Sequence, residues 1–445
     1  MRIRSRGRHQ RRLGRPFGRL WVGFTLASSG DGLAYGAMPL LAVVVDPHPL
    51  AVSTVVAADS LPWLLLALPA GAFADRFERG PVMALANLLR AAALLAAALL
   101  VATGLINLAL LVIIVLINAG ARATYYSSMQ AIVPELVKDD ALERANGVLT
   151  GTEAGAEYLA GPVVGTTLFA ASQSAPFFAD AIALIASCIP FVRFRSRAPA
   201  PAESSNSIWE GARLLFADRR LRVLVLMIAS LSFFQGMESG VLVLLATKVW
   251  GVREGAYGFF LAASAVGGIL GSALADGSAR RFGNARTIVG AAVVSGLSYL
   301  VMATSHTWVV AAPTFALVGV AIAMTTVVAI SLRQRLTPPH LMGRVGSAWR
   351  GLVWGAAPVG ALVGGGVATV GGLRLPLVLA GALQCVVAAV FARPLLRSTR
   401  NDIPSQEPSG SEVPGGSEEP NGPERDTLSL PVRTESAPSG LVDPE

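Results

Sequence analysis

Long apolar segments recur along most of this chain, and they limit its possible folds more than any other feature. They fill most of residues 17–395, and in the run 91–101 no polar residue interrupts them. Such a run excludes the alternating pattern of a membrane β-barrel. A helix of about 20 mostly apolar residues crosses a bilayer, and it satisfies its own backbone amides in hydrocarbon. The sequence therefore predicts an all-α membrane protein.

The segments number twelve, so we expect twelve transmembrane helices. Composition agrees, because 53% of the residues are hydrophobic and 14% are charged, against about 25% charged in soluble proteins. The predicted spans are 17–45, 51–74, 81–102, 105–126, 142–170, 174–194, 221–248, 255–277, 285–304, 308–331, 345–369 and 374–395.

The positions of lysine and arginine predict the orientation of these helices. With both termini in the cytoplasm, 32 of the 36 Lys and Arg residues fall in cytoplasmic segments, and Lys248, Arg253 and Arg374 fall outside. The remaining one, Arg90, lies within a predicted helix. Positive residues favour the cytoplasmic side, and one helix more or fewer would remove the asymmetry. We therefore expect cytoplasmic N- and C-termini.

Composition also divides the chain into parts. A polar linker, 195–220, separates a six-helix bundle at 17–194 from a second at 221–395. Residues 1–16 form a basic cytoplasmic arm, and 396–445 are rich in Pro, Ser, Gly and Glu. The latter composition predicts a disordered cytoplasmic tail.

The two predicted bundles share short motifs, which indicates an internal repeat. Three pairs recur in the same order, 204, 204 and 201 residues apart: Asp31-Gly32-x-x-x-Gly36 with Gln235-Gly236-x-x-x-Gly240, Gln130-x-x-x-Pro134 with Gln334-x-x-x-Pro338, and Asp75-x-x-x-Arg79 with Asp276-x-x-x-Arg280. Two pseudo-symmetric bundles with a site between them near the midplane are the architecture of many secondary transporters.

Two further motifs resemble the major facilitator superfamily, and within it the bacterial branch of siderophore and macrolide exporters. The segment Gly71-x-x-x-Asp75-Arg76-x-x-Arg79 matches the family signature between helices 2 and 3, although Gly80 replaces a usual basic residue. Gly161-Pro162-x-x-Gly165 is similar to part of the motif associated with antiporters, although Thr166 replaces a second glycine and Glu157 an earlier one. The resemblance covers residues 17–395.

The resemblance implies a cytoplasmic gate in which Asp75 latches the two halves together. We expect Gly71, Asp75, Arg76 and Arg79 to form it, with Arg122 as the cationic partner of Asp75. The alternative is a turn that only fixes the topology.

Ionisable residues within the predicted helices are functional candidates, because a charge at the bilayer centre costs about 2.5–3.5 kcal/mol on insertion scales. Glu153 and Glu157 are four residues apart and share one helix face. Their repulsion and desolvation favour uptake and release of a proton. We predict proton coupling at Asp31, Glu153, Glu157 and Arg90, with Arg90 paired to Asp31 or to one glutamate. Buried structural ion pairs are the alternative.

A cavity for an amphipathic molecule needs aromatic walls with a few polar groups. The predicted substrate-binding residues are Tyr35, Tyr158, Phe234, Gln235, Glu238 and Trp354. Each aromatic residue could instead pack between helices or face lipid. Asp59 and Asp180 lie nearer the outer surface, where structural pairing or capping is the favoured interpretation.

The sequence has no Gly-x-x-x-x-Gly-Lys-[Ser/Thr] motif for ATP, so uphill transport would use an ion gradient. The acids within the helices suggest protons as the coupling ion, and the resemblance implies an antiporter that exports a small amphipathic molecule, such as a drug or siderophore, by alternating access. An importer or uniporter of a small metabolite remains open. A membrane-embedded transferase is disfavoured because the 4 His residues have no acidic cluster beside them.

The expected partners are a small-molecule substrate, protons and the lipid bilayer. We expect a monomer in a bacterial plasma membrane, with no metal, no other cofactor and no nucleic acid. The net charge of +8 does not contradict this, because the basic residues are scattered among short loops.

Overall fold

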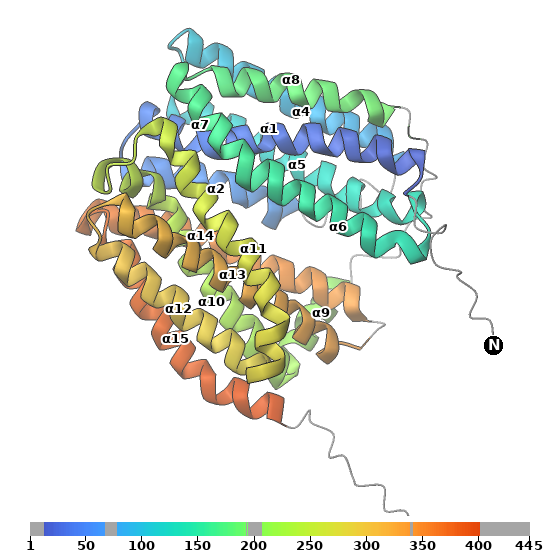
Figure 1. The fold of residues 1–445 in the computed structure, drawn as a ribbon, viewed down its shortest axis with the longest axis vertical. Coiled ribbons are helices and arrows are strands. Elements are labelled where there is room, and N and C mark those ends of the chain that lie inside the picture. The colour runs from blue at the N-terminus through green and yellow to red at the C-terminus, as the bar shows by residue number, and fades with distance from the viewer. Residues whose placement is uncertain (1–12, 67–77, 193, 195–206, 339–340, 401–445) are drawn as a thin grey trace, which may run out of the picture. The chain divides into compact units, whose positions relative to one another are not determined.

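The computed structural model describes residues 13–66, 78–192, 194, 207–338 and 341–400, and all of its regular structure is helical (Figure 1). Ten of the described helices are long and apolar enough to cross a membrane. The predicted second and fifth spans correspond to α2 and to α6–η2–α7, which are not among these ten. The chain is thus a multi-pass helical membrane protein, and the number twelve stays a prediction.

The first half of the chain contains six predicted spans. Its helices are α1 (Arg15–Val45), α2 (Pro49–Leu66), α4 (Arg79–Ala102), α5 (Leu108–Leu136), η1 (Asp139–Ala141), α6 (Leu142–Glu153), η2 (Ala154–Ala160), α7 (Gly161–Ala171) and α8 (Ala175–Val192). The helix η2 is a π-helical segment that joins α6 to α7 without a break. In this half α1 packs on α7 and α8, α4 packs on α5 and α8, and α2 packs on α5.

The second half repeats these pairings. Its helices are α9 (Ser207–Ala217), α10 (Arg219–Leu244), η3 (Leu245–Val249), η4 (Glu254–Ala256), α11 (Tyr257–Phe282), α12 (Asn284–Thr304), α13 (Trp308–Leu336), α14 (Met342–Gly371) and α15 (Leu375–Arg400). Here α10 packs on α14 and α15, α12 packs on α13 and α15, and α11 packs on α13. Helix for helix, these are the contacts of the first half, as expected for an internal repeat.

Glycines of the repeated motif explain one pairing in each half. A Cβ atom added to Gly32 of α1 would lie 2.7 Å from the Cα of Gly161, and one added to Gly236 of α10 would lie 2.1 Å from the carbonyl oxygen of Ala357 in α14. Only a residue without a side chain allows these helix backbones to approach so closely. The motif pair found in the sequence therefore marks equivalent helix crossings.

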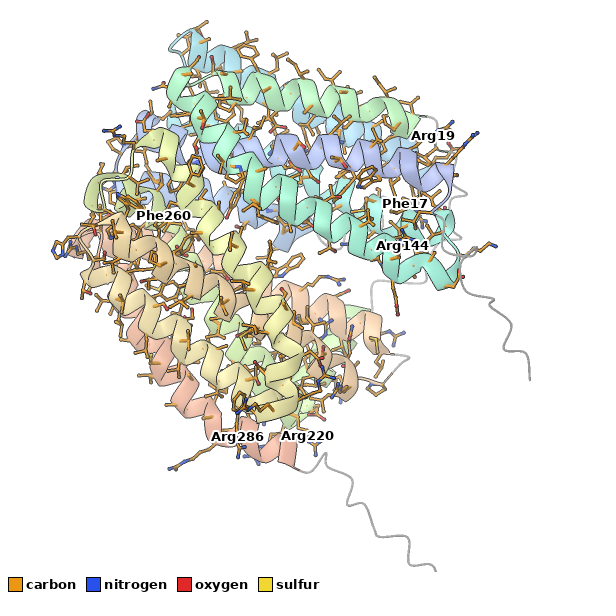
Figure 2. All side chains as sticks on the ribbon, in the orientation of Figure 1. Phe17, Arg19, Arg144, Arg220, Phe260 and Arg286 are labelled. Carbon is orange, nitrogen blue, oxygen red and sulfur yellow. The ribbon has the colours of Figure 1, made fainter. Side chains whose placement is uncertain are left out.

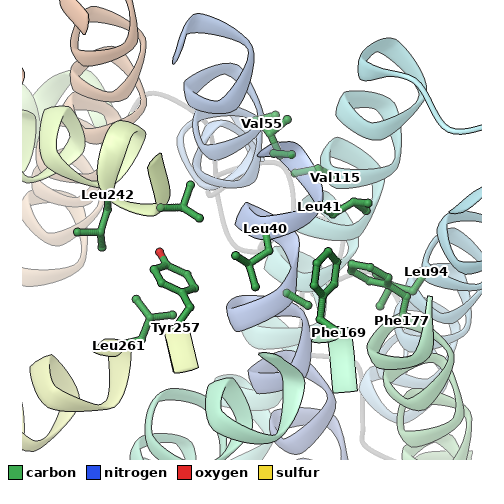
Figure 3. Close-up of a cluster of buried hydrophobic side chains, with 14 of the residues drawn as sticks. Leu40, Leu41, Val55, Leu94, Val115, Phe169, Phe177, Leu242, Tyr257 and Leu261 are labelled. Carbon is green, nitrogen blue, oxygen red and sulfur yellow. The ribbon is translucent and has the colours of Figure 1, made fainter. Parts of the chain in front are cut away.

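One group of apolar contacts between the halves lies at one end of the helices. Leu40 of α1, Leu242 of α10 and Tyr257 of α11 belong to one buried cluster that includes both halves (Figure 3). At the opposite ends of the helices, the second cluster of the described chain contains residues of the second half alone. We call the end that contains Leu40, Leu242 and Tyr257 the α7 end, because α7, η4 and the start of α11 meet there. Arg19, Arg144, Arg220 and Arg286 lie at helix ends away from Phe260 (Figure 2).

A hydrogen-bonded threonine also joins the halves at the α7 end. The hydroxyl of Thr166 donates to the carbonyl oxygen of Gly255 at 3.3 Å and accepts from the amide of Gly258 at 3.1 Å. Thr166 is completely buried. The residue that departs from the antiporter motif thus connects α7 to η4 and α11.

Most predicted helix boundaries lie within five residues of those observed, but one is wrong. The fourth span was expected to end at residue 126, whereas α5 ends at Leu136. The polar residues of α5 face protein or a cavity, so they do not end the helix. The Gln130-x-x-x-Pro134 motif therefore lies within α5 and not after it.

Candidate functional site

A cavity of about 640 Å³ lies between the two halves, within the size range of small-molecule sites. The first half contributes Tyr35, Asp59, Ser60, Trp63, Arg122, Tyr126, Gln130, Glu153, Glu157 and Tyr158. The second half contributes mainly small, apolar and uncharged polar residues, among them Ser232, Gln235, Ser295, Tyr299, Thr325, Trp349, Trp354 and Gln384. Among the described lining residues, every charged group belongs to the first half, with three acids against one arginine.

Arg122 and Glu157 form the central ion pair of this cavity. Arg122 donates to Glu157, whose side chain is 1% exposed, and its Nε lies 3.7 Å from Oδ2 of Asp31. The guanidinium also lies over the ring of Tyr126, 5.6 Å from the ring centroid. A charge buried to this extent needs such a partner, because leaving it unpaired costs several kcal/mol.

The hydroxyl of Tyr126 lies between the two glutamates that the sequence singled out. It is 3.1 Å from Oε2 of Glu157 and 3.3 Å from Oε1 of Glu153. A tyrosine hydroxyl has one proton to donate, so it satisfies one carboxylate at a time. The other contact becomes a hydrogen bond only when that glutamate holds a proton and donates to the hydroxyl oxygen. The three groups therefore form a site that can store one proton.

The predicted shared face of Glu153 and Glu157 is confirmed, since both line the same cavity. The local structure differs from the expected α-helix, because η2 begins directly after Glu153 and includes Glu157. Short π-helical segments inside α-helices are rare and often occur at functional sites.

Behind the cavity wall, Asp31 and Arg90 form a buried pair. Arg90 is completely buried and donates to Asp31, which is 4% exposed. Two further donors of Arg90 are also satisfied: Nε donates to Oδ1 of Asn118 at 3.2 Å, and Nη1 donates to Oδ1 of Asn87 at 3.1 Å. Of the partners that the sequence left open, Asp31 is the one observed. Neither residue lines the cavity, and the ion-pair contact of Asp31 with a cavity residue is the one with Arg122.

The structure contradicts the expected role of one of two other acids. Asp59 lines the cavity, and its expected structural role stays a prediction. Asp180 is completely buried in α8, and neither of its carboxylate oxygens has a hydrogen-bond partner among the described residues. The expected pairing or capping by Asp180 is therefore absent from the described part of the chain.

Four of the six predicted substrate-binding residues line the cavity: Tyr35, Tyr158, Gln235 and Trp354. The Tyr35 and Tyr158 rings meet edge to face at 5.5 Å. The ring of Trp354 meets that of Trp63 at 5.7 Å, which links α14 to α2 across the cavity wall.

The other two, Phe234 and Glu238, do not line the cavity. On α10 the cavity face includes Gln235 and Ser239, whereas Phe234 and Glu238 are 6% and 3% exposed and point into the packed interior. Oε1 of Glu238 has no hydrogen-bond partner among the described residues. Helical periodicity alone could not show which face of α10 lines the cavity, because the faces beside the cavity face are also buried in the protein.

Only part of the predicted cytoplasmic gate can be located. Gly71, Asp75 and Arg76 lie outside the described residues. Arg79 is buried, pairs with Glu135 and donates to the carbonyl oxygen of Ala131 at 2.8 Å. Arg122 was expected to pair with Asp75, but its guanidinium lies in the central cavity on Glu157.

Sequence reasoning missed α5 as a cavity wall. Arg122, Tyr126 and Gln130 follow each other at intervals of four residues and all line the cavity. This spacing places them on one helix face. Because the helix was expected to end at residue 126, Arg122 was counted with the cytoplasmic loops.

Comparisons with known proteins agree with this architecture. A family described as transmembrane secretion effector matches residues 14–422. The multidrug efflux pump Tap of Mycolicibacterium fortuitum is 27% identical over 396 residues, which cover 83% of this chain and 94% of that protein.

Solved structures also share the fold. A bacterial homologue of the iron transporter ferroportin, in an inward-facing state, has a TM-score of 0.68 at 18% identity and covers 85% of this chain and 98% of its own. A bacterial homologue of the human lysosomal transporter Spinster, inward-facing and occupied, has a TM-score of 0.69 at 13% identity, with 87% and 97% covered.

Proposed function

Because the chain belongs to the transmembrane secretion effector family of the major facilitator superfamily, we propose that this transporter is a proton-coupled antiporter that exports a small amphipathic cation. The multidrug efflux pump Tap supports export. The charge of the cavity supports a cation, because Asp59, Glu153 and Glu157 outnumber Arg122. Its aromatic residues suit an amphipathic body.

The main support for proton coupling is the position of the Tyr126 hydroxyl between Glu153 and Glu157. Arg122 is engaged by Glu157, so Glu153 is the acid with the freer carboxylate. In the proposed cycle Glu153 holds either a proton or the positive end of the substrate. The cation displaces the proton on the cytoplasmic side, and a proton displaces the cation on the outer side. This competition couples the two fluxes in opposite directions.

The contacts at the α7 end support alternating access. The α7 end joins both halves through Leu40, Leu242 and Tyr257 and through Thr166. We propose that this is the outer end and that it is closed, with the cavity reached from the cytoplasmic side. Rocking of the two halves about the cavity would then expose it to the outside.

This proposal retains several finer expectations about topology. They are twelve spans in two bundles at 17–194 and 221–395, the linker 195–220, the cytoplasmic segments 1–16 and 396–445, a monomeric state, and a bacterial plasma membrane. The gate at Gly71, Asp75, Arg76 and Arg79 is retained from the family signature.

Purified protein in proteoliposomes tests the proposed function, with ethidium as the probe cation. Ethidium transport driven by a pH gradient is compared with ethidium counterflow, which needs no net proton movement. We expect Glu153→Gln to abolish the gradient-driven flux and to retain counterflow only at a higher ethidium concentration, because the amide cannot pair with the cation whereas Asp59 and Glu157 still line the cavity. Glu143→Gln, a change at an exposed acid of α6 that lines neither cavity described here, is the matched control. Gradient-driven flux that survives in Glu153→Gln would disprove proton coupling at this residue.

A further inference from the structure

A second cavity, of about 370 Å³, lies within the first half beside α5 and α6. Three of its lining residues, Tyr126, Gln130 and Glu153, also line the cavity between the halves. The others do not: Phe24, Met129, Val133, Asn146, Leu149 and Thr150. Glu153 therefore stands where two cavities meet.

The spacing of the lining residues gives the direction of the second cavity. On α5 they fall at 126, 129, 130 and 133, and on α6 at 146, 149, 150 and 153. Each set forms one helix face. From Glu153 and Tyr126 the cavity follows both helices for seven residues, about 10 Å at 1.5 Å per residue. It runs toward the connection between α5 and α6, which the proposed topology places on the cytoplasmic side.

Polar groups accompany the apolar walls of this cavity. Asn146, Thr150 and Gln130 are exposed side chains that offer donors and acceptors along its length. A cavity that is roomy and has such partners can hold several waters, and hydrogen-bonded waters carry protons. Met129 and Val133 are buried apolar residues on its α5 wall.

Among the described residues that line the second cavity, Glu153 is the one acid. Other ionisable groups close enough to act on it are Tyr126 and Arg122 from α5, Glu157 from η2 and Asp31 from α1. Arg122 and Asp31 do not line the second cavity, and neither does Glu157. Within the described residues, a proton that leaves through this cavity therefore has Glu153 as its starting acid.

We propose that the second cavity is a proton-release path from Glu153 to the cytoplasm that bypasses the substrate cavity. The Glu153 carboxyl group transfers its proton to a water, which leaves a carboxylate and a hydronium that passes the charge along the waters of the cavity. The proposal rests on the proposed antiport function. It resolves a conflict in that mechanism, because a substrate entering the main cavity would obstruct a proton leaving by the same route. With a separate path, arrival of the cation and loss of the proton occur together.

Two variants block the path by different means. Thr150→Phe fills it with a bulky ring, and the double variant Asn146→Leu with Thr150→Val removes polar groups at similar volume. Gly147→Phe is the matched control on α6, because a Cβ there meets no atom within 4 Å and the residue lines neither cavity. Thr150→Ser retains the hydroxyl and should behave as wild type.

The test measures ethidium transport in proteoliposomes in both modes. We expect both blocking variants to slow pH-gradient-driven transport at least about tenfold, with counterflow unchanged because the substrate cavity is intact. The control and Thr150→Ser should match wild type in both modes. Equal loss of both modes in the two blocking variants, or no loss in either, would overturn the path. Failure of the proposed function itself looks different: wild-type protein would then show counterflow without any response to the pH gradient.

Discussion

Arg122 of α5 forms an ion pair with Glu157 in the wall of the central cavity, and Glu157 is almost completely buried. The pair holds together α5 and the π-helical segment of the fifth predicted span. Removing the arginine leaves a carboxylate without its main partner in a site of low polarity. Substitution of Arg122 should therefore lower the stability of the protein as well as its transport activity.

We expect Arg122→Gln to lower the free energy of unfolding by about 3–5 kcal/mol, because it leaves a buried charge uncompensated. Adding Glu157→Gln should recover most of this loss, since no charge is then left unpaired. Thermal and denaturant unfolding of the detergent-solubilised protein measures both values.

The control for this experiment is the exposed pair of Arg280 and Asp276, whose side chains are 77% and 72% exposed. Arg280→Gln should change the free energy of unfolding by less than about 1 kcal/mol. A loss at Arg122 no larger than that at Arg280 would contradict the assigned burial energetics.

Tyr126→Phe removes the hydroxyl that lies between Glu153 and Glu157. It should cost about 1 kcal/mol of stability for the lost hydrogen bond and should slow gradient-driven ethidium transport more than counterflow. Tyr125→Phe is a neighbouring control, because the buried Tyr125 hydroxyl has no hydrogen-bond partner among the described residues. Its removal should leave the ratio of the two transport modes unchanged. If both variants change that ratio equally, Tyr126 has no special part in proton coupling.

The sequence predicted the all-helical membrane fold because its signals are local. Segment length, composition and repeated motifs led to helical spans in two related halves. The i, i+4 spacing of Glu153 and Glu157 correctly placed both on one face. Arg90 was expected to need an acid, and Asp31 provides it.

The errors arose where tertiary environment decides the outcome. A polar stretch such as Arg122 to Gln130 reads as a helix end when its surroundings are unknown, yet in the folded chain it continues the helix against a cavity. The π-helical segment η2 has no sequence signal of its own. Glu238 was predicted to bind substrate, but it lies on the buried side of α10, beside the face of Gln235 and Ser239 that lines the cavity.

Thr166→Val tests whether the hydrogen bonds of Thr166 help to hold the two halves together at the α7 end. The change preserves shape but removes both hydrogen bonds with Gly255 and Gly258. Each bond contributes about 0.5–1.5 kcal/mol, so the equilibrium should move several-fold toward states in which this end is open.

Spin labels at two exposed positions of the loops at this end, Gln173 in the first half and His306 in the second, measure the shift. Pulsed electron resonance should show a larger population at long distance in Thr166→Val. Thr167→Val is the matched control, because among the described residues the Thr167 hydroxyl bonds the carbonyl oxygen of Val163 within α7 and no group of the other half. An unchanged distance distribution in Thr166→Val would show that the apolar cluster alone closes this end.

Gly32→Ala tests whether the repeated glycine motif is required for helix packing. The added methyl group would lie 2.5 Å from the carbonyl oxygen of Ala156 and 2.7 Å from the Cα of Gly161, so α1 must move away from the fifth span. Overpacking of this kind costs about 1–3 kcal/mol. Gly151→Ala in α6 should be neutral or stabilising, because a Cβ there meets nothing within 4 Å and alanine favours helix. Thermal unfolding of both variants decides the matter: a Gly32→Ala protein as stable as Gly151→Ala would mean that the crossing tolerates a side chain and that the motif has another purpose.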